Sequence, residues 1–430
     1  MSATLSAQVC VVGGGPAGLA LGLQLARHSV DVVVVEQSAQ FDRSFRGESI
    51  SPDSVWLLRE LGILDKVREH TLETRRMEVG DAGRIVLSAS FADFDQPCPY
   101  PMELPQPPLL TALADEASTL PSFRLLRRTK ALRLLTDGDA VTGLVAKGPD
   151  GDVEIGADLT VAADGRFSRV RELSGLSYDK TPLERDFVWF KAPMPAEWDL
   201  HTYRVRILGE RHGLFIPTVP DQVRIGFNIP KGGLRELRAQ GIGALHARID
   251  ELAPEAGPGV REHVRGWSDT SVLDIFTTVV PRWSRPGLVL LGDAAHTLTP
   301  ILGQGVNHAV IDAVTLAPLV ADALAAPGST RTALAGATAE FQRVREPGVA
   351  RARGLQLRQE RAFALASPVA KALRRAAYRG VSASPPLKRR ILAGVYYQLQ
   401  QSVRDGSTTL RLAPRPAASA SPTPTGGPTS

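Results

Sequence analysis

The stretch VVGGGPAGLALGLQLARHSVDVVVVEQ, residues 11–37, has the pattern of a strand, a glycine-rich turn, a helix and a second strand. Gly13, Gly15 and Gly18 form G-x-G-x-x-G directly after the first strand, while Glu36 ends the second. Such glycines permit a tight turn and close approach of a pyrophosphate, whose charge the helix start favours. A carboxylate at Glu36 suits a ribose hydroxyl and would repel a 2′-phosphate. The stretch therefore predicts a dinucleotide site. The expected contacts there are Gly13, Gly15, Pro16, Ala17, Gly18, Glu36 and Gln37.

A second glycine-rich stretch, LGDAAHTLTPILGQGVNHAVIDA at residues 291–313, ends an apolar run in Gly-Asp and then restarts as a helix. Asp293 follows a predicted strand, where it can bind hydroxyls of a ribose or ribityl chain. Gly303 and Gly305 let backbone N–H groups approach a ligand, and the helix start adds partial positive charge. We expect this stretch to hold a ligand with electron-rich oxygens.

A third stretch, LTVAADGRFSRVREL at residues 159–173, ends an apolar strand in Asp164-Gly165 and continues with several arginines. Taken alone, it fits either a ligand-binding turn or a plain β-turn with surface arginines.

The composition limits the classes of protein. The chain has 430 residues, 43% of them hydrophobic, and a net charge of only +5, which disfavours a nucleic-acid partner. Cys10 and Cys98 give neither metal-ligand spacing nor a disulfide framework, as expected of a cytoplasmic protein. The sequence shows no run of 18 apolar residues and no signal peptide, so we expect no stable membrane span and no metal.

The three motifs occur in the order and approximate spacing seen in class A FAD-dependent aromatic monooxygenases, the para-hydroxybenzoate hydroxylase-like family. The chain resembles this family over most of Val9 to about Leu365. The resemblance implies an α/β fold, with a Rossmann-like FAD-binding lobe built on a parallel sheet, an antiparallel β-sheet substrate lobe and C-terminal helices.

The implied boundaries divide the chain into seven segments. The FAD-binding lobe takes 1–74, 101–180 and 281–345, and the substrate lobe takes 75–100 and 181–280. A C-terminal helical region covers 346–411, and 412–430 is a disordered tail. Within this plan we expect one helix over LRELRAQGIGALHARIDEL (234–252), one over Pro52 to Lys66 and one over Glu340 to Leu365. A basic region, KALRRAAYRG and LKRRILAGVYYQLQQ (371–401), fits a solvated helix face better than a membrane-binding surface.

The resemblance also implies the chemistry. Such an enzyme uses NADPH or NADH as a transient reductant, adds dioxygen to the reduced flavin, and hydroxylates an aromatic or polyketide-like molecule through a flavin hydroperoxide. We expect a monomer or homodimer. In addition to the dinucleotide contacts given above, the residues implied to contact FAD are Arg46, Gln106, Asp164, Gly292, Asp293, Pro300, Gly303, Gln304, Gly305, Val306 and Asn307.

The reaction requires no protein nucleophile, because the flavin carries it. His296 is a weak candidate for an acid or base, and Asp312 is expected to be structural. His201, Tyr203 and His212 lie in the substrate lobe and fit ordinary strand residues better than phenol-binding ones.

Two alternatives stay open. The segment Gly47-Glu48-Ser49-Ile50 with Pro52 also resembles flavin-dependent halogenases and geranylgeranyl-reductase-like proteins. The halogenase pattern W-x-W-x-I-P is missing, and GLFIP at 213–217 is its nearest echo. The other alternative is a non-catalytic binding protein on the same fold, such as the prenyl-protein escort proteins.

Overall fold

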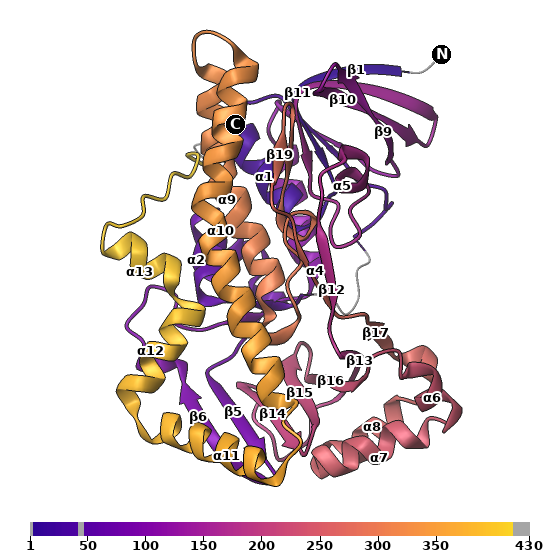
Figure 1. Ribbon diagram of the computed structural model, residues 1–430, viewed down its shortest axis with the longest axis vertical. Coiled ribbons are helices and arrows are strands. Elements are labelled where there is room, and N and C mark those ends of the chain that lie inside the picture. The colour runs from indigo at the N-terminus through magenta and orange to yellow at the C-terminus, as the bar shows by residue number, and fades with distance from the viewer. Residues whose placement is uncertain (1–2, 42–46, 416–430) are drawn as a thin grey trace, which may run out of the picture.

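A parallel sheet forms the upper part of the molecule in Figure 1. The computed structural model describes residues 3–41 and 47–415. The strand order is β19-β20-β11-β1-β2-β8, with the β9–β10 hairpin joined to β11. The strands are β1 (Ala3–Val12), β2 (Val32–Val35), β8 (Phe123–Leu126), β9 (Lys130–Asp137), β10 (Ala140–Gly148), β11 (Gly151–Ala162), β19 (Ser284–Arg285) and β20 (Leu288–Leu290).

The central parallel strands end at the same level. Val12 pairs with Val35 on one side and with Ala162 on the other, and Ala162 pairs with Leu290. All four residues of β2 are buried, as expected for a strand covered on both faces. Because the carboxyl ends are in register, the segments after β1, β2, β11 and β20 meet at one edge of the sheet.

Helices α1 and α9 of this lobe pack against each other. The helices of this lobe are α1 (Pro16–Arg27), α4 (Gln106–Ser118), α5 (Arg169–Ser174), α9 (Gln304–Ala325) and the first part of α10 (Thr330–Phe363). A Cβ on Gly18 of α1 would lie 1.9 Å from the carbonyl oxygen of Gly13. The segment Ile301–Ala325, which contains α9, is long and apolar enough to span a membrane, but 61% of its most apolar window is buried inside the molecule. It is therefore a core helix and does not indicate a stable membrane span.

A second sheet forms the lower part of the molecule, in the order β17-β13-β16-β15-β14-β5-β6 (Figure 1). Its strands are β5 (Arg76–Asp81), β6 (Arg84–Ser90), β13 (Arg185–Pro193), β14 (Thr202–Leu208), β15 (Arg211–Thr218), β16 (Gln222–Pro230) and β17 (Ser271–Leu273). The sheet is mixed and not wholly antiparallel as expected, because β14 pairs with β5 in parallel.

The two faces of this sheet have different neighbours. Phe190, Phe215 and Phe227 belong to a core that also includes residues of α7 (Gly243–Leu252) and α8 (Gly257–His263). The opposite face carries Trp189 and Ile216, which share a cluster with Phe363 at the end of α10. Thus α10 begins on the parallel sheet and ends against the mixed sheet.

Short elements join the two sheets. A three-stranded sheet consists of β3 (Ser49–Ile50), β7 (Met102–Glu103) and β4 (Leu72–Glu73), and a separate pair consists of β12 (Asp179–Pro182) and β18 (Phe276–Val279). The remaining helices are α2 (Pro52–Glu60), α3 (Leu64–Val67), α6 (Leu234–Ala239), α11 (Pro368–Ala383), α12 (Pro385–Tyr396) and α13 (Gln398–Arg404).

Glycine breaks two of the expected helices. The helix expected over 234–252 is two helices, α6 and α7, because Gly241 adopts a φ of +80° between them. The one expected over Pro52 to Lys66 divides into α2 and α3 at Gly62, whose φ is +73°. These left-handed conformations end a helix with little strain only at glycine.

The C-terminal segments pack more closely than expected. Arg374 in the basic region is buried and donates to Asp81 through Nε and Nη2 at 3.0 and 2.8 Å, so it does not lie on a solvated face. The expected disordered tail starts too early at 412, because the backbone N–H of Ala413 donates to Gln24 and the Ala413 side chain is buried. Residues 416–430 lie outside the described part of the chain.

The first prediction concerns the contact that brings α1 close to the β1 turn. Gly18→Ala should lower the free energy of unfolding by about 3 kcal/mol, because the new methyl group would overlap the Gly13 carbonyl. Gly336→Ala, in an open position on α10, is the matched control and should raise stability by about 0.5–1 kcal/mol. Urea unfolding of both variants measures this, and equal stability of the two would contradict the packing.

Candidate active site

The turn after β1 is held by the acid at the end of β2. The Glu36 carboxylate is buried and accepts hydrogen bonds from the backbone N–H of Gly14 at 2.7 Å and of Ser38 at 2.8 Å. Gln37, next to it, is exposed. Helix α1 starts after Gly15, and no side chain of the described residues caps its first turn. The start of α1 therefore offers backbone donors at the common edge of the strands.

The turn after β20 lies between two helices. Gly292 has a φ of +59°, and a Cβ there would be 3.4 Å from Ala17 of α1 and 3.5 Å from Ala309 of α9. Asp293 follows in a short 3-10 helix (Gly292–Ala294), and its Oδ1 would lie 3.9 Å from a Cβ on Gly305. This geometry places the Asp293 carboxylate beside the first turn of α9.

The segment before α9 has an unusual backbone. Pro300 precedes a short 3-10 turn, and both Leu302 and Gly303 have positive φ, at 63° and 58°. Helix α9 then starts at Gln304, again without a side-chain cap. The first turn of α9 therefore presents N–H groups that no side chain caps.

Asn307 fixes this loop to β3. Its Nδ2 donates to the carbonyl oxygens of Gly303 at 2.7 Å and Ser49 at 3.2 Å, and its Oδ1 accepts from the N–H of Ser51 at 2.8 Å. Val306 lies next to Gly47, where a Cβ would come within 3.4 Å of the valine. Residues 303–307 are therefore held against the segment that follows residue 46.

Asp164 uses its carboxylate within its own turn. It accepts hydrogen bonds from the Ser168 hydroxyl and the backbone N–H of Val170, and burial raises its pKa. Arg171 is buried and donates to the carbonyl of Ala294 at 2.9 Å. The segment therefore braces the turn after β20, and this arginine is not a surface residue.

Two expected residues approach the site from elsewhere. Gln106 begins α4, is buried, and donates through Nε2 to the Gly47 carbonyl at 3.4 Å. Among the described residues its Oε1 has no hydrogen-bond partner. Arg46 lies outside the described residues.

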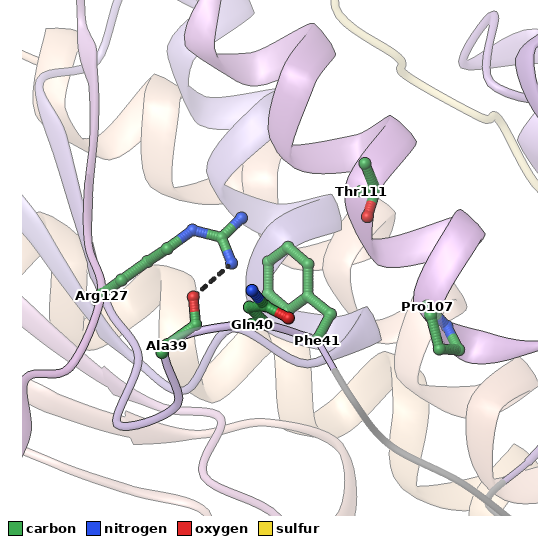
Figure 2. A pocket seen from close by; sticks show the side chains of 6 residues that line it. All are labelled: Ala39, Gln40, Phe41, Pro107, Thr111 and Arg127. Atoms are coloured by element: carbon green, nitrogen blue, oxygen red, sulfur yellow. Dashed lines mark hydrogen bonds between the residues drawn. The ribbon is translucent and has the colours of Figure 1, made fainter.

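A cavity of about 370 Å³ lies beyond Glu36. Figure 2 shows Arg127 lying over the ring of Phe41, 4.0 Å from its centroid, and donating to the carbonyl of Ala39. The lining residues are Ala39, Gln40, Phe41, Pro107, Thr111 and Arg127. The cavity is open to solvent and lies between the segment after β2, the residue that follows β8 and the first turns of α4.

A buried charged cluster adjoins the loop at 303–307, and sequence reasoning missed it. The cluster consists of Glu48, Ser49, Glu103, Lys191 and Arg224. Arg224 is 5% exposed and Glu103 is 3% exposed, although both belong to residue types that favour solvent. A lone arginine within the apolar strand run QVRIGFNIP was the available signal.

The constellation at the strand ends fits a dinucleotide. Two helix starts without side-chain caps provide donors for phosphate or carbonyl oxygens. Carboxylates at Glu36 and Asp293 can accept from ribose or ribityl hydroxyls, and the unpartnered Oε1 of Gln106 is a further acceptor.

Comparison with known proteins agrees with this geometry. The FAD binding domain family matches residues 6–344. A relative from Streptomyces rimosus, 6-methylpretetramide 4-monooxygenase, is 35% identical over 408 residues, which are 94% of this chain and 93% of the relative. The chain belongs to the FAD-dependent aromatic monooxygenases.

Solved structures share the fold. P. aeruginosa PqsL, in complex with 2-aminobenzoylacetate, has a TM-score of 0.72 at 24% identity, covering 88% of this chain and all of that one. The p-nitrophenol 4-monooxygenase PnpA from Pseudomonas putida DLL-E4 has a TM-score of 0.74 at 20% identity, covering 92% and 98%. The chain is an FAD-dependent monooxygenase, so the halogenase or reductase alternative and the non-catalytic alternative are the weaker ones.

His296 belongs to a buried network of this monooxygenase. Its Nε2 lies 2.7 Å from Asp312, whose other oxygen accepts from Arg345 Nε at 2.6 Å. The adjacent His296 and Arg345 hold the pKa of the Asp312 carboxyl far below its usual range, although burial opposes them. Asp312 also accepts from the N–H of Gly292. This network supports the turn after β20 from behind, and His296 is 2% exposed.

His201 and His212, two of the other candidate side chains, lie in different environments. His201 pairs through Nδ1 with the Glu73 carbonyl at 2.8 Å. His212 is fully buried between Phe187 and Phe363, and neither ring nitrogen has a hydrogen-bond partner among the described residues. Burial, and to a smaller extent nearby arginines, lowers the pKa of His212 to about 3.

The second prediction follows from His212. Its pKa is lower in the folded protein than in the unfolded chain, so the unfolded chain binds the extra proton and stability falls as the pH drops below about 6.5. His212→Phe removes this contribution. As the pH is lowered from 7 to 5, the free energy of unfolding of the variant should rise by about 2 kcal/mol relative to that of the parent.

Urea unfolding at several pH values measures this difference. His70→Phe, at an exposed side chain, is the control and should follow the parent at every pH. A constant difference between His212→Phe and the parent would contradict the buried neutral imidazole.

Proposed function

We propose that this monooxygenase uses NADH or NADPH and dioxygen to hydroxylate a phenolic or polyketide-like aromatic molecule. The supporting observation is the set of strand ends in register, which brings the three glycine-rich turns to one edge. The similarity over nearly the whole chain to 6-methylpretetramide 4-monooxygenase from S. rimosus favours an aromatic, polyketide-like substrate.

We assign the ADP half of FAD to the first turn. Gly13, Gly15 and Gly18 allow the close approach, and Glu36 would accept from the ribose. The cavity that Arg127 and Phe41 line lies beside this end. The other residues proposed for this half are Pro16, Ala17 and Gln37.

We assign the flavin half to the second turn and the start of α9. Asp293 would bind the ribityl and pyrophosphate region. The proposed neighbours of the flavin half are Gln106, Gly292, Pro300, Gly303, Gln304, Gly305, Val306 and Asn307. Contact between Arg46 and the middle of the cofactor stays a prediction. Asp164, held in the turn after β11, would contribute to FAD binding in the same region.

The protein contributes position and charge. When bound, the flavin supplies the redox chemistry, taking two electrons from NAD(P)H and activating dioxygen. N–H groups in the first turn of α9 carry partial positive charge and would stabilise negative charge on a neighbouring ring. The mixed sheet would shield the reacting atoms from water.

The remaining parts of the proposal concern the surroundings. Cys10 and Cys98 are both free and buried, which fits a reducing cytoplasm. We expect a monomer or a homodimer, without nucleic acid.

The third prediction tests the activity. The purified protein should be yellow, and phenolic or polyketide-like aromatics should accelerate its oxidation of NADPH or NADH. Product mass should rise by one oxygen atom. Oxidation that no member of the aromatic panel accelerates, together with a requirement for separately supplied reduced flavin, would contradict the proposal.

The fourth prediction tests the cofactor site. Asp293→Ala should weaken FAD binding roughly tenfold, since a hydrogen bond to a charged group contributes about 1.5 kcal/mol or more. Asp322→Ala, also on this lobe but in an exposed ion pair with Arg411, is the control. Fluorescence titration of the apoprotein with FAD measures both, and equal affinities would refute the role of Asp293.

A further inference from the structure

Glu103 lies at the centre of the buried charged cluster. Its Oε2 accepts hydrogen bonds from the Ser49 hydroxyl at 2.9 Å and from Arg224 Nη2 at 3.2 Å. Ser49 is also the residue against which the loop before α9 packs, since a Cβ on Gly303 would lie 3.1 Å from the serine Cβ. Only the Ser49 side chain therefore lies between the Glu103 carboxylate and the loop that is proposed to face the flavin.

Several polar atoms of this region have no hydrogen-bond partner among the described residues. They are Glu48 Oε2, Arg224 Nε and Trp189 Nε1, and all three are buried. The first two lie 3.7 Å apart, beyond hydrogen-bond distance. Buried polar groups are normally satisfied, so an acceptor and two donors left in one place indicate a ligand with complementary oxygens.

An aromatic side chain lies beside these atoms. The Trp189 ring lies over Gly226, where a Cβ would be 2.6 Å from the ring, and the guanidinium carbon of Arg224 is 5.3 Å from the ring centroid. Lys191 pairs with Arg224 across β13 and β16, and its Nζ is 3.8 Å from Glu48. A flat ring bearing oxygens suits this combination of indole and charged groups.

We propose that this cluster binds the acidic hydroxyl of the aromatic substrate and the carbonyl oxygen beside it, and that Glu103 accepts the hydroxyl proton. This inference rests on the proposed function for the reaction that follows. The O–H bond of the substrate breaks, a new O–H bond forms on the Glu103 carboxylate, and the electron pair stays on the substrate oxygen. Nothing is oxidised or reduced in this step. The negative charge on the substrate oxygen raises the electron density on the ring carbons ortho and para to it. These are the positions that an electrophilic oxygen attacks.

The electrostatics of the cluster suit a proton acceptor. Burial is the main cause that raises the pKa of Glu103 to about 7; Arg224 and the Ser49 hydrogen bond lower it, and Glu48 raises it further. A carboxyl with a pKa near neutrality can both take and release a proton. Among the described residues, the other ionisable side chains beside the cluster are Lys191 of β13, Tyr203 of β14 and Tyr396 of α12. Burial raises the pKa of both phenols, so they stay protonated.

The fifth prediction uses a coloured probe with the FAD-loaded protein. In 1,8-dihydroxyanthraquinone both hydroxyls flank a carbonyl, and its anion absorbs at longer wavelength than the neutral form. The parent protein should bind the probe and lower the pH at which the anion band appears. The dimethyl ether of the probe has no proton to give, and its affinity should be lower than that of the probe by about tenfold or more.

Three variants locate the effect. Glu103→Gln should abolish the anion band at neutral pH and weaken probe binding about tenfold, without changing the affinity for the dimethyl ether. Ser49→Ala keeps both carboxylates but removes a hydrogen bond that lowers the pKa of Glu103, so the carboxylate becomes a stronger proton acceptor and the band should appear at lower pH. Glu73→Gln, a partly exposed carboxylate of the same small sheet, is the matched control and should behave as the parent.

The outcomes separate this inference from the proposed function. FAD retention and NAD(P)H oxidation report on the proposed function, whereas the difference between probe and dimethyl ether reports on the cluster. An unchanged anion band in Glu103→Gln, or equal binding of probe and ether by the parent, would overturn the inference even if hydroxylation is found. No binding of the probe to the parent would also overturn it. If Glu103→Gln does not fold, an unshifted band in Ser49→Ala decides against it.

Discussion

The register of the parallel strands is the constraint on which the rest of the structure depends. Val12, Val35, Ala162 and Leu290 end their strands side by side, so turns from distant parts of the sequence meet at one edge. Gly292 lies between Ala17 of α1 and Ala309 of α9 over that edge, and its φ of +59° is a conformation that favours glycine. The two helix starts without side-chain caps follow from this arrangement, and they supply the positive potential that a dinucleotide requires.

Two buried clusters of charged side chains, one around Asp312 and one around Arg224, flank this edge and have different roles. Behind it, Asp312 neutralises Arg345 and holds the N–H of Gly292, so its charges are satisfied within the protein. In front of it, Glu48 and Arg224 keep polar atoms without partners among the described residues. The ion pair between Asp312 and Arg345 stabilises the loop geometry, whereas the polar atoms of Glu48 and Arg224 favour a ligand, because uncompensated burial of charge is costly.

The sequence predicted the glycine-rich turns, whose signals are local, and missed the charged cluster around Glu103, which tertiary contacts assemble. Glycine spacing and apolar runs located the turns at Gly13 and Gly303, since both depend on backbone geometry that few residues allow. Helix ends at Gly62 and Gly241 were missed, because glycine inside an apolar pattern does not reveal its φ. Glu103 joins its partners from β3 and β16 only when the chain folds, and no spacing along the sequence records that.

The most direct test of the central claim is a crystal structure of the FAD-loaded protein. We expect the adenosine ribose at Glu36 and the pyrimidine edge of the flavin facing the backbone N–H groups of residues 305–307. A flavin bound elsewhere, with the edge where the strands end filled by protein side chains, would contradict it.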